Sequence, residues 1–162
     1  MPHAAALASQ IQQALLRHDV HRAPLGCWRL QQRCVLISHP SAPPTGEPAR
    51  APDGRPRFAS GHWLTPHFVP SGRLRHAVRD ASTPLLEWAA WERSVILGLR
   101  AGVALPVPGV GHLTVTAARG IARPCFRFAA SFRHRIGADQ ARLLGLRSPG
   151  DLRPLAGWPP AH

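Results

Sequence analysis

The sequence predicts a mixed α+β fold in which one short unit occurs twice in tandem. First, 18 prolines and 14 glycines against 6% aromatic residues indicate short elements joined by many turns. Second, helical apolar spacing alternates with strand–turn–strand patterns along the chain. Third, a helical apolar stripe recurs at a shift of 84 residues and a hairpin glycine at a shift of 85. The matching residues are Leu7, Ile11 and Leu15 with Trp91, Val95 and Leu99, and Gly26 with Gly111.

The first unit is expected over residues 4–80. Apolar residues at helical spacing predict a helix from Ala4 to His18. The stretch DVHRAPLGCWRLQQRCVLIS then alternates around a Pro-Leu-Gly break, as two strands joined by a tight turn do. Residues 39–57 are rich in Pro, Gly, Ala, Ser and Arg without periodicity, which predicts an exposed arm. An extended stretch to Phe68 and a short helix from about Ser71 close the unit.

The second unit is expected over residues 82–136. Ser82 or Thr83 is a candidate N-cap, with Pro84 at the first helical position. The helix ends near Gly102, and VALPVPGVGHLTVTA predicts a second hairpin. A very short arm, RGIARP, precedes CFRFAASFRHRI, where Phe128 and Ser131 repeat the spacing of Phe68 and Ser71. Residues 137–162 form a Pro/Arg-rich tail with one short helix expected over 138–146.

Charge is the strongest functional signal. Twenty basic residues, all arginine, stand against 8 acidic residues, which gives a formal net charge of +12. A GC-rich genome explains arginine in place of lysine, but it does not explain why acidic residues are so few. The charge therefore favours a polyanionic partner such as nucleic acid.

Several classes of protein are disfavoured by the sequence. The three cysteines lack CxxC spacing, so neither a disulfide framework nor a zinc ribbon is indicated. The N-terminus does not resemble a signal peptide, and no apolar stretch approaches the length of a membrane span, so we expect a cytoplasmic protein without a membrane partner. No base–nucleophile constellation, cofactor fingerprint or metal-ligand quartet is present. We therefore expect a binding protein that is not an enzyme and has no cofactor or metal.

Three segments carry a family resemblance. LPVPGVGHLTV looks like a glycine-turn hairpin, FVPSGRLRHAV is similar to a closing Phe-x-Pro-Gly-x-x-Leu-x-x-x-Val segment, and PPTGEP resembles an arm sequence Asn-Pro-x-Thr-Gly-Glu. Together they resemble the HU/IHF superfamily of bacterial DNA-binding proteins. The single main helix of each unit, and LLRHDV before the first hairpin, are closer to shortened tandem HU variants. The resemblance covers most of residues 5–136 and implies that the chain packs as a pseudo-dimer, either as a monomer or in a homodimer.

The resemblance also implies a DNA-binding surface. Proteins of this type insert basic β-arms into the minor groove and open a base step with an apolar wedge, usually proline. The wedge candidates are Pro44 in the first arm and Pro124 in the second. The arginines that would contact phosphates are Arg50, Arg55, Arg57, Arg119 and Arg123 in the arms, with Arg73, Arg75, Arg127, Arg133 and Arg135 in the closing segments.

These observations favour a sequence-independent, nucleoid-associated DNA-binding protein. Two alternatives stay open at this point. One is a protein-interaction or cell-envelope scaffolding module of the same fold that has lost DNA binding. The other is an RNA-binding protein, for which the same charge is equally suitable.

Overall fold

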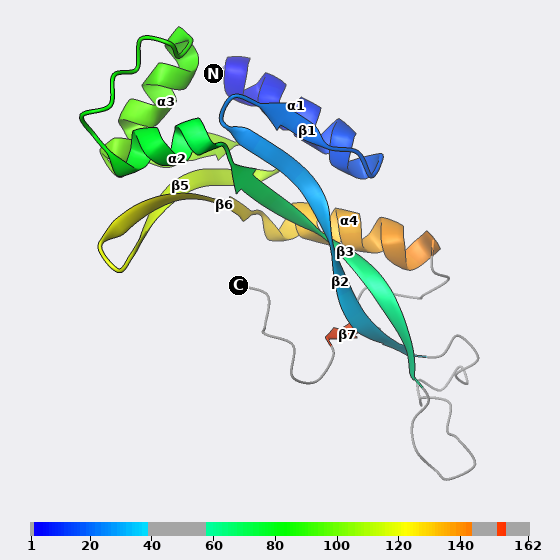
Figure 1. The fold of residues 1–162 in the computed structure, drawn as a ribbon. Helices are drawn as coiled ribbons and strands as arrows, with labels where there is room; N and C mark the ends of the chain where they lie inside the picture. The colour runs from blue at the N-terminus through cyan, green and yellow to red at the C-terminus, as the bar shows by residue number, and fades with distance from the viewer. Residues whose placement is uncertain (1, 39–57, 144–151, 155–162) are drawn as a thin grey trace, which may run out of the picture. The chain divides into compact units, whose positions relative to one another are not determined.

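The computed structural model describes residues 2–38, 58–143 and 152–154 (Figure 1). The fold is mixed α+β, as predicted. Its elements are α1 (Pro2–Leu16), β1 (His21–Ala23), β2 (Gly26–Ser38), β3 (Phe58–Pro70), α2 (Gly72–Arg79), α3 (Ala90–Arg100), β4 (Leu105–Val107), β5 (Gly111–Ala118), β6 (Ile121–Phe128), α4 (Ala130–Leu143) and β7 (Leu152–Pro154).

The strands form two antiparallel sheets. One has the order β1-β2-β3, with β7 also paired to β2, and the other has the order β4-β5-β6. The first arm, residues 39–57, lies outside the described residues. The second arm is the β5–β6 hairpin, which turns at Arg119 and Gly120. Both turn residues have positive φ angles, 53° and 75°, as a two-residue hairpin turn of type I′ requires.

The chain divides into two compact units. The larger comprises Met1–Leu30 and Pro66–Arg133, and the smaller comprises Gln31–Thr65 and His134–His162. The larger unit contains α1, α2, α3 and the whole β4-β5-β6 sheet. Within it, the three helices lie on the same side of this sheet (Figure 1).

An aromatic cluster forms the core of the larger unit. The rings of Trp28 and Phe68 lie 4.6 Å apart, and the ring of Phe126 lies 5.8 Å from each of them. The cluster continues through Phe128 to Phe132. Trp28, Phe68 and Phe132 are buried, and a large apolar side chain that is fully buried contributes about 1.5–3 kcal/mol to folding. The early and late parts of the chain therefore share one core.

The ends of α1 and α3 have the same backbone hydrogen bonds at a shift of 84 residues. In α1 the amides of Arg17, His18 and Asp19 donate to the carbonyls of Ala14, Leu15 and Ala14. In α3 the amides of Ala101, Gly102 and Val103 donate to the carbonyls of Gly98, Leu99 and Gly98. These bonds satisfy the last carbonyls of each helix, as a Schellman-type ending does.

The link from hairpin to closing helix also recurs. Ser71 donates its amide to the Leu25 carbonyl at 3.1 Å, and Ala129 donates its amide to the Val110 carbonyl at 2.8 Å. Ala129 therefore occupies the place of Ser71. The sequence pattern matched Ser71 with Ser131, which lies two residues after the structurally equivalent Ala129. A serine cap is recognisable in a sequence, whereas the alanine that takes its place is not.

The hairpin glycines matched at a shift of 85 have a common packing role. A Cβ atom at Gly26 would lie 2.5 Å from the Val69 carbonyl oxygen. A Cβ atom at Gly111 would clash in the same way with the Arg127 carbonyl oxygen. Each glycine therefore allows the strand before the closing helix to approach its hairpin closely.

The predicted start of α3 is wrong. The helix begins at Ala90, with Ala89 as its N-cap, instead of near Pro84. The Asp80 carboxylate accepts hydrogen bonds from both the amide and the hydroxyl of Ser82, at 3.0 and 2.6 Å. Ser82 therefore closes a turn after α2 and is not free to cap a helix.

The closing helix α4 is longer than its counterpart α2. It continues to Leu143. The boundary predicted between the second unit, which was expected to end at residue 136, and the tail from residue 137 therefore falls inside a helix. The short helix expected over 138–146 is the continuation of α4 as far as Leu143, and residues 144–146 lie outside the described part of the chain.

Candidate nucleic-acid interface

The β5–β6 hairpin has one core-facing side and one outer face. Leu113 pairs with Phe126, and both contribute to the core side. Because successive side chains of a strand alternate, the neighbouring pairs His112–Arg127, Thr114–Cys125 and Thr116–Arg123 lie on the opposite side. We call these six residues the outer face of the hairpin. It combines exposed arginines with hydroxyl groups, both of which bind phosphate oxygens.

The tip of this hairpin is basic and partly apolar. Arg119 is exposed at the turn, and Ile121, directly after the turn, has 41% of its surface exposed. Pro124 does not lie at the tip. It is buried in β6 opposite Val115, so it lacks the exposure expected of the wedge in the second arm. Ile121 is the large exposed apolar residue among the described residues at this place.

The second basic feature is a cleft between α2 and β6. Helix α2 begins at this point because the Ser71 hydroxyl accepts the Leu74 amide at 3.0 Å and donates to the Pro24 carbonyl at 2.8 Å. The helix buries Leu74, Ala77 and Val78, which leaves its basic residues on the exposed side. We call the hollow beside them the basic cleft. Its volume is about 540 Å³, and its charged or titratable lining residues are Arg75, His76, Arg79 and Arg123.

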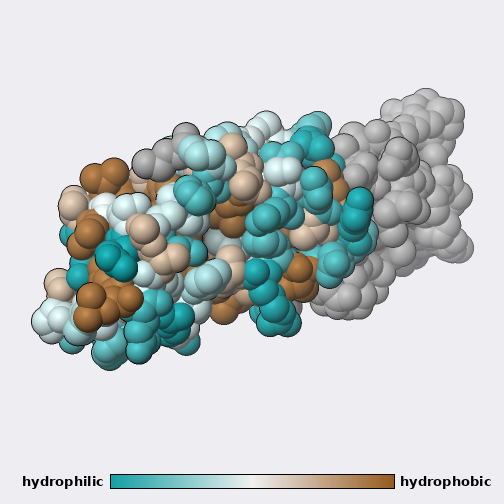
Figure 2. Space-filling model, turned by 90° about the horizontal axis from the view of Figure 1, so that it is seen from above, coloured by the Kyte–Doolittle hydropathy of each residue, from teal (hydrophilic) through white to brown (hydrophobic). Residues whose placement is uncertain are grey.

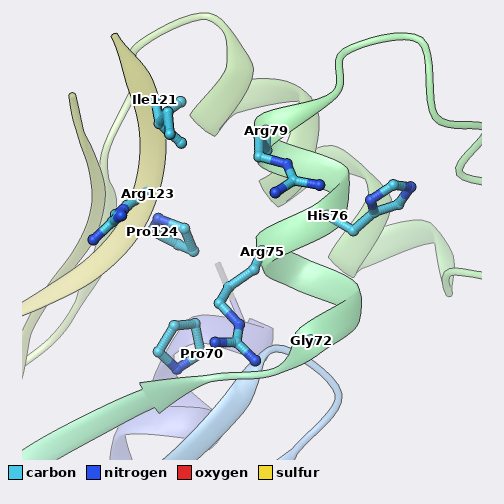
Figure 3. Close-up of a pocket in the computed structure, with 9 residues that line it drawn as sticks. Pro70, Gly72, Arg75, His76, Arg79, Ile121, Arg123 and Pro124 are labelled. Atoms are coloured by element: carbon cyan, nitrogen blue, oxygen red, sulfur yellow. The ribbon is translucent and has the colours of Figure 1, made fainter. Parts of the chain in front are cut away.

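The two walls of the basic cleft differ in character. Arg75 and Arg79 extend from α2, and Pro124 of β6 faces this helix (Figure 3). Pro70 and Ile121 complete the apolar part of the lining. The side chain of Arg123 turns away from α2, toward the outer face (Figure 3). Arg123 therefore connects the cleft with the outer face across the edge of the sheet.

The arginines separate into two groups by their bonding. Arg73 lies 4.4 Å above the ring of Trp88 and donates to the Glu87 carbonyl at 3.3 Å. Arg93 donates to the Trp88 carbonyl at 3.1 Å, and Arg100 donates to three carbonyls. These three residues hold the segment between α2 and α3. Arg73 was expected to contact nucleic acid, but its guanidinium has a structural role here.

On α2 and the β5–β6 hairpin, five arginines have guanidinium groups that bond to nothing within the part of the chain that the structure describes. They are Arg75, Arg79, Arg119, Arg123 and Arg127, and all belong to the larger unit. All five are exposed. Such groups are available to phosphate without the loss of an existing bond.

The remaining predicted residues lie elsewhere. Arg133 is exposed in the first turn of α4, and Arg135 follows in the same helix. Pro44, Arg50, Arg55 and Arg57 lie outside the described residues. Sequence reasoning missed His112, Thr114 and Thr116, although the alternation within GHLTVTA places all three on one face.

Within the described residues, none that lines the basic cleft is acidic. Asp80, just after α2, has its pKa lowered, first by the hydrogen bonds from Ser82 and to a smaller extent by the charge of His76. Asp80 thus stays ionised at the end of α2. The cleft itself remains basic along its lining.

Three of the five exposed large apolar residues in the described part of the chain gather at a different place. Leu86, Leu97 and Val103 lie in α3 or next to it, and the view from above shows hydrophobic patches at this end of the larger unit (Figure 2). Among the described residues, no helix is long and apolar enough to cross a membrane, and no group of three or more His, Cys, Asp or Glu side chains could hold a metal ion.

Comparison of the chain with protein-family models, curated proteins and solved structures finds no match.

Proposed function

We propose that this protein binds double-stranded DNA without sequence preference, through the backbone phosphates. The observation that carries the proposal is the set of five unbonded, exposed arginines on α2 and the β5–β6 hairpin, next to a cleft that no acidic side chain of the described residues lines. The formal charge of +12 gives the same surface a long-range attraction for a polyanion.

The proposed architecture is a tandem HU-like pseudo-dimer. Helix, three antiparallel strands and helix follow one another twice along the chain. The recurring helix endings and the Ser71–Leu25 and Ala129–Val110 bonds support an origin by duplication. The shared aromatic core supports the packing of both halves within one polypeptide. We therefore expect a protein that binds DNA as a monomer.

The side chains on the outer face of the hairpin are better suited to contact the DNA backbone than to recognise particular bases. Arginine and threonine donate to phosphate oxygens, and such contacts position a protein without reading the sequence. Near the turn, Ile121 has the apolar character and exposure of a residue that inserts between base steps. We assign to Ile121 the wedge role that was expected of Pro124.

The first test compares polyanions under one set of conditions. Fluorescence anisotropy would measure binding to two random 25-base-pair DNA duplexes, one AT-rich and one GC-rich, and to an RNA hairpin of equal charge. The proposal predicts affinities within about threefold for the two duplexes, as phosphate contacts imply, and weaker binding to RNA. A strong preference for the RNA would favour the RNA-binding alternative. Failure to bind any of them would favour the protein-interaction module.

A further inference from the structure

The basic cleft joins parts of the chain that are far apart in sequence. Its α2 wall belongs to the first helix–strand–helix set, and its β6 wall belongs to the second. We infer that this cleft seats one phosphodiester strand of the bound nucleic acid, which then bridges the two halves of the chain. The inference rests on the proposed function and adds a particular site and ligand to it.

The positive wall of the cleft matches the charge of a nucleic-acid backbone. Arg75 and Arg79 are four residues apart in α2, so they lie on one side of the helix, about 6 Å apart along its axis. Neither guanidinium bonds to another described residue. Both can therefore donate to neighbouring phosphate groups of one strand.

The opposite wall matches the uncharged part of the same ligand. Pro70 and Pro124 give it an apolar surface, against which deoxyribose can pack. Pro124 also lacks an amide proton, so this position of β6 offers no backbone donor toward the cleft. A volume of about 540 Å³ lies within the usual range of ligand clefts, about 300–1,000 Å³.

The cleft adjoins the outer face of the hairpin at Arg123, which belongs to both. Arg123 lines its rim, and its side chain turns toward the outer face (Figure 3). Arg127 follows on the same side of β6. A strand that leaves the cleft over Arg123 therefore meets a second exposed arginine. Because no carboxylate of the described residues lines the cleft, a cation is an unsuitable ligand for it.

The test uses the full chain and three variants of equal charge. Arg75→Gln and Arg79→Gln change the cleft, whereas Arg17→Gln removes one exposed charge at the end of α1, outside the cleft. The probes are a fluorescent hexathymidylate, a 25-base-pair duplex and inorganic tripolyphosphate. We expect each cleft variant to weaken hexathymidylate binding about tenfold, and to reduce the salt slope of duplex binding by about one, as expected for one lost phosphate contact. Arg17→Gln should stay within twofold of the wild type.

Two further measurements separate strand binding from a folding defect and from the capture of free phosphate. Arg79→Lys keeps the charge and should recover most of the hexathymidylate affinity, and the thermal unfolding midpoints should show that all variants fold. Tripolyphosphate at equal phosphate concentration should compete poorly with hexathymidylate. Full competition would overturn the inference, because the site would then bind free phosphate groups instead of a strand.

The outcomes separate the cleft from the overall function. If the wild type binds the duplex and the cleft variants behave as Arg17→Gln does, the inference is wrong and the proposed function stands. If the wild type binds neither the duplex nor hexathymidylate, both are wrong.

Discussion

His18 occupies at the end of α1 the left-handed position that Gly102 occupies at the end of α3, with φ angles of 57° and 79°. The surrounding hydrogen bonds are the same: each residue donates its amide to the carbonyl three residues earlier, at 3.0 and 3.1 Å. Glycine adopts this conformation without steric cost, whereas a residue with a Cβ atom does not. The first helix ending is therefore strained and the second is not.

This difference predicts opposite effects of two substitutions. His18→Gly should raise the free energy of unfolding by about 1 kcal/mol, because relief of strain exceeds the added freedom of the unfolded chain. Gly102→Ala should lower it by about 1 kcal/mol for the converse reason. Chemical denaturation of both variants checks this. A destabilised His18→Gly variant would contradict the equivalence of the two endings.

Arg100 makes the main hydrogen-bonded connection between the end of α2 and the segment before α3. Its guanidinium donates to the carbonyls of Ala77, Asp80 and Thr83 at 2.9, 3.3 and 3.0 Å. A hydrogen bond from a charged donor contributes about 1.5–3 kcal/mol, and solvent weakens these three because two are only part-buried and one is exposed. Arg100→Ala should therefore lower the free energy of unfolding by about 3 kcal/mol in total. Arg100→Lys should recover little, since an ammonium group lacks the fork that reaches three acceptors.

The control for this prediction is an exposed arginine. Arg17→Ala should change the free energy of unfolding by less than about 0.5 kcal/mol. Equal denaturation midpoints for Arg100→Ala and Arg17→Ala would show that the three carbonyl bonds do not stabilise the fold.

His21 makes the stability of the protein depend on pH. Burial lowers the pKa of its imidazole below 6.5, and its buried Nε2 atom has no hydrogen-bond partner among the described residues. As pH falls below 6.5, the unfolded chain binds the proton first. The contribution of His21 is therefore complete above pH 6.5 and is lost as pH falls through the folded-state pKa.

His21→Leu tests this dependence, because Leu105 holds the matching position in β4. The variant should be more stable than the wild type by about 1 kcal/mol at pH 7.5, since the unpartnered polar atom is removed. The difference should widen at pH 5.5, as measured by urea denaturation at both pH values. The His18→Gly variant keeps His21 and should retain the wild-type dependence. An equal difference at both pH values would contradict the role assigned to His21.

Local signals predicted much of the fold. The apolar stripe of α1, the Ser71 cap of α2 and the glycine turns of both hairpins are features of neighbouring residues, and the structure confirms the elements they define. The start of α3 was wrong because Ser82 bonds to Asp80 instead of capping a helix. The place of Ala129 was missed because an alanine cap carries no recognisable side chain.

The candidate site was predictable only in part. The sequence shows that Arg75 and Arg123 are basic, but it does not show that α2 and β6 lie next to each other. These two elements come together only because both halves of the chain contribute to one core, and local sequence patterns do not reveal such long-range packing. Arg73 could not be distinguished from Arg75 by sequence, because its contact with Trp88 depends on the path of the segment before α3. Pro124 was misplaced because the strand register decides which residue stands next to the turn.

The decisive test of phosphate binding is the salt dependence of duplex affinity, measured by fluorescence anisotropy on a random-sequence duplex. If all five unbonded arginines contact phosphates, the slope of log affinity against log salt concentration should be about −4.5 or steeper. A slope near zero, or no binding at physiological salt, would contradict the proposal that this surface binds DNA through its backbone.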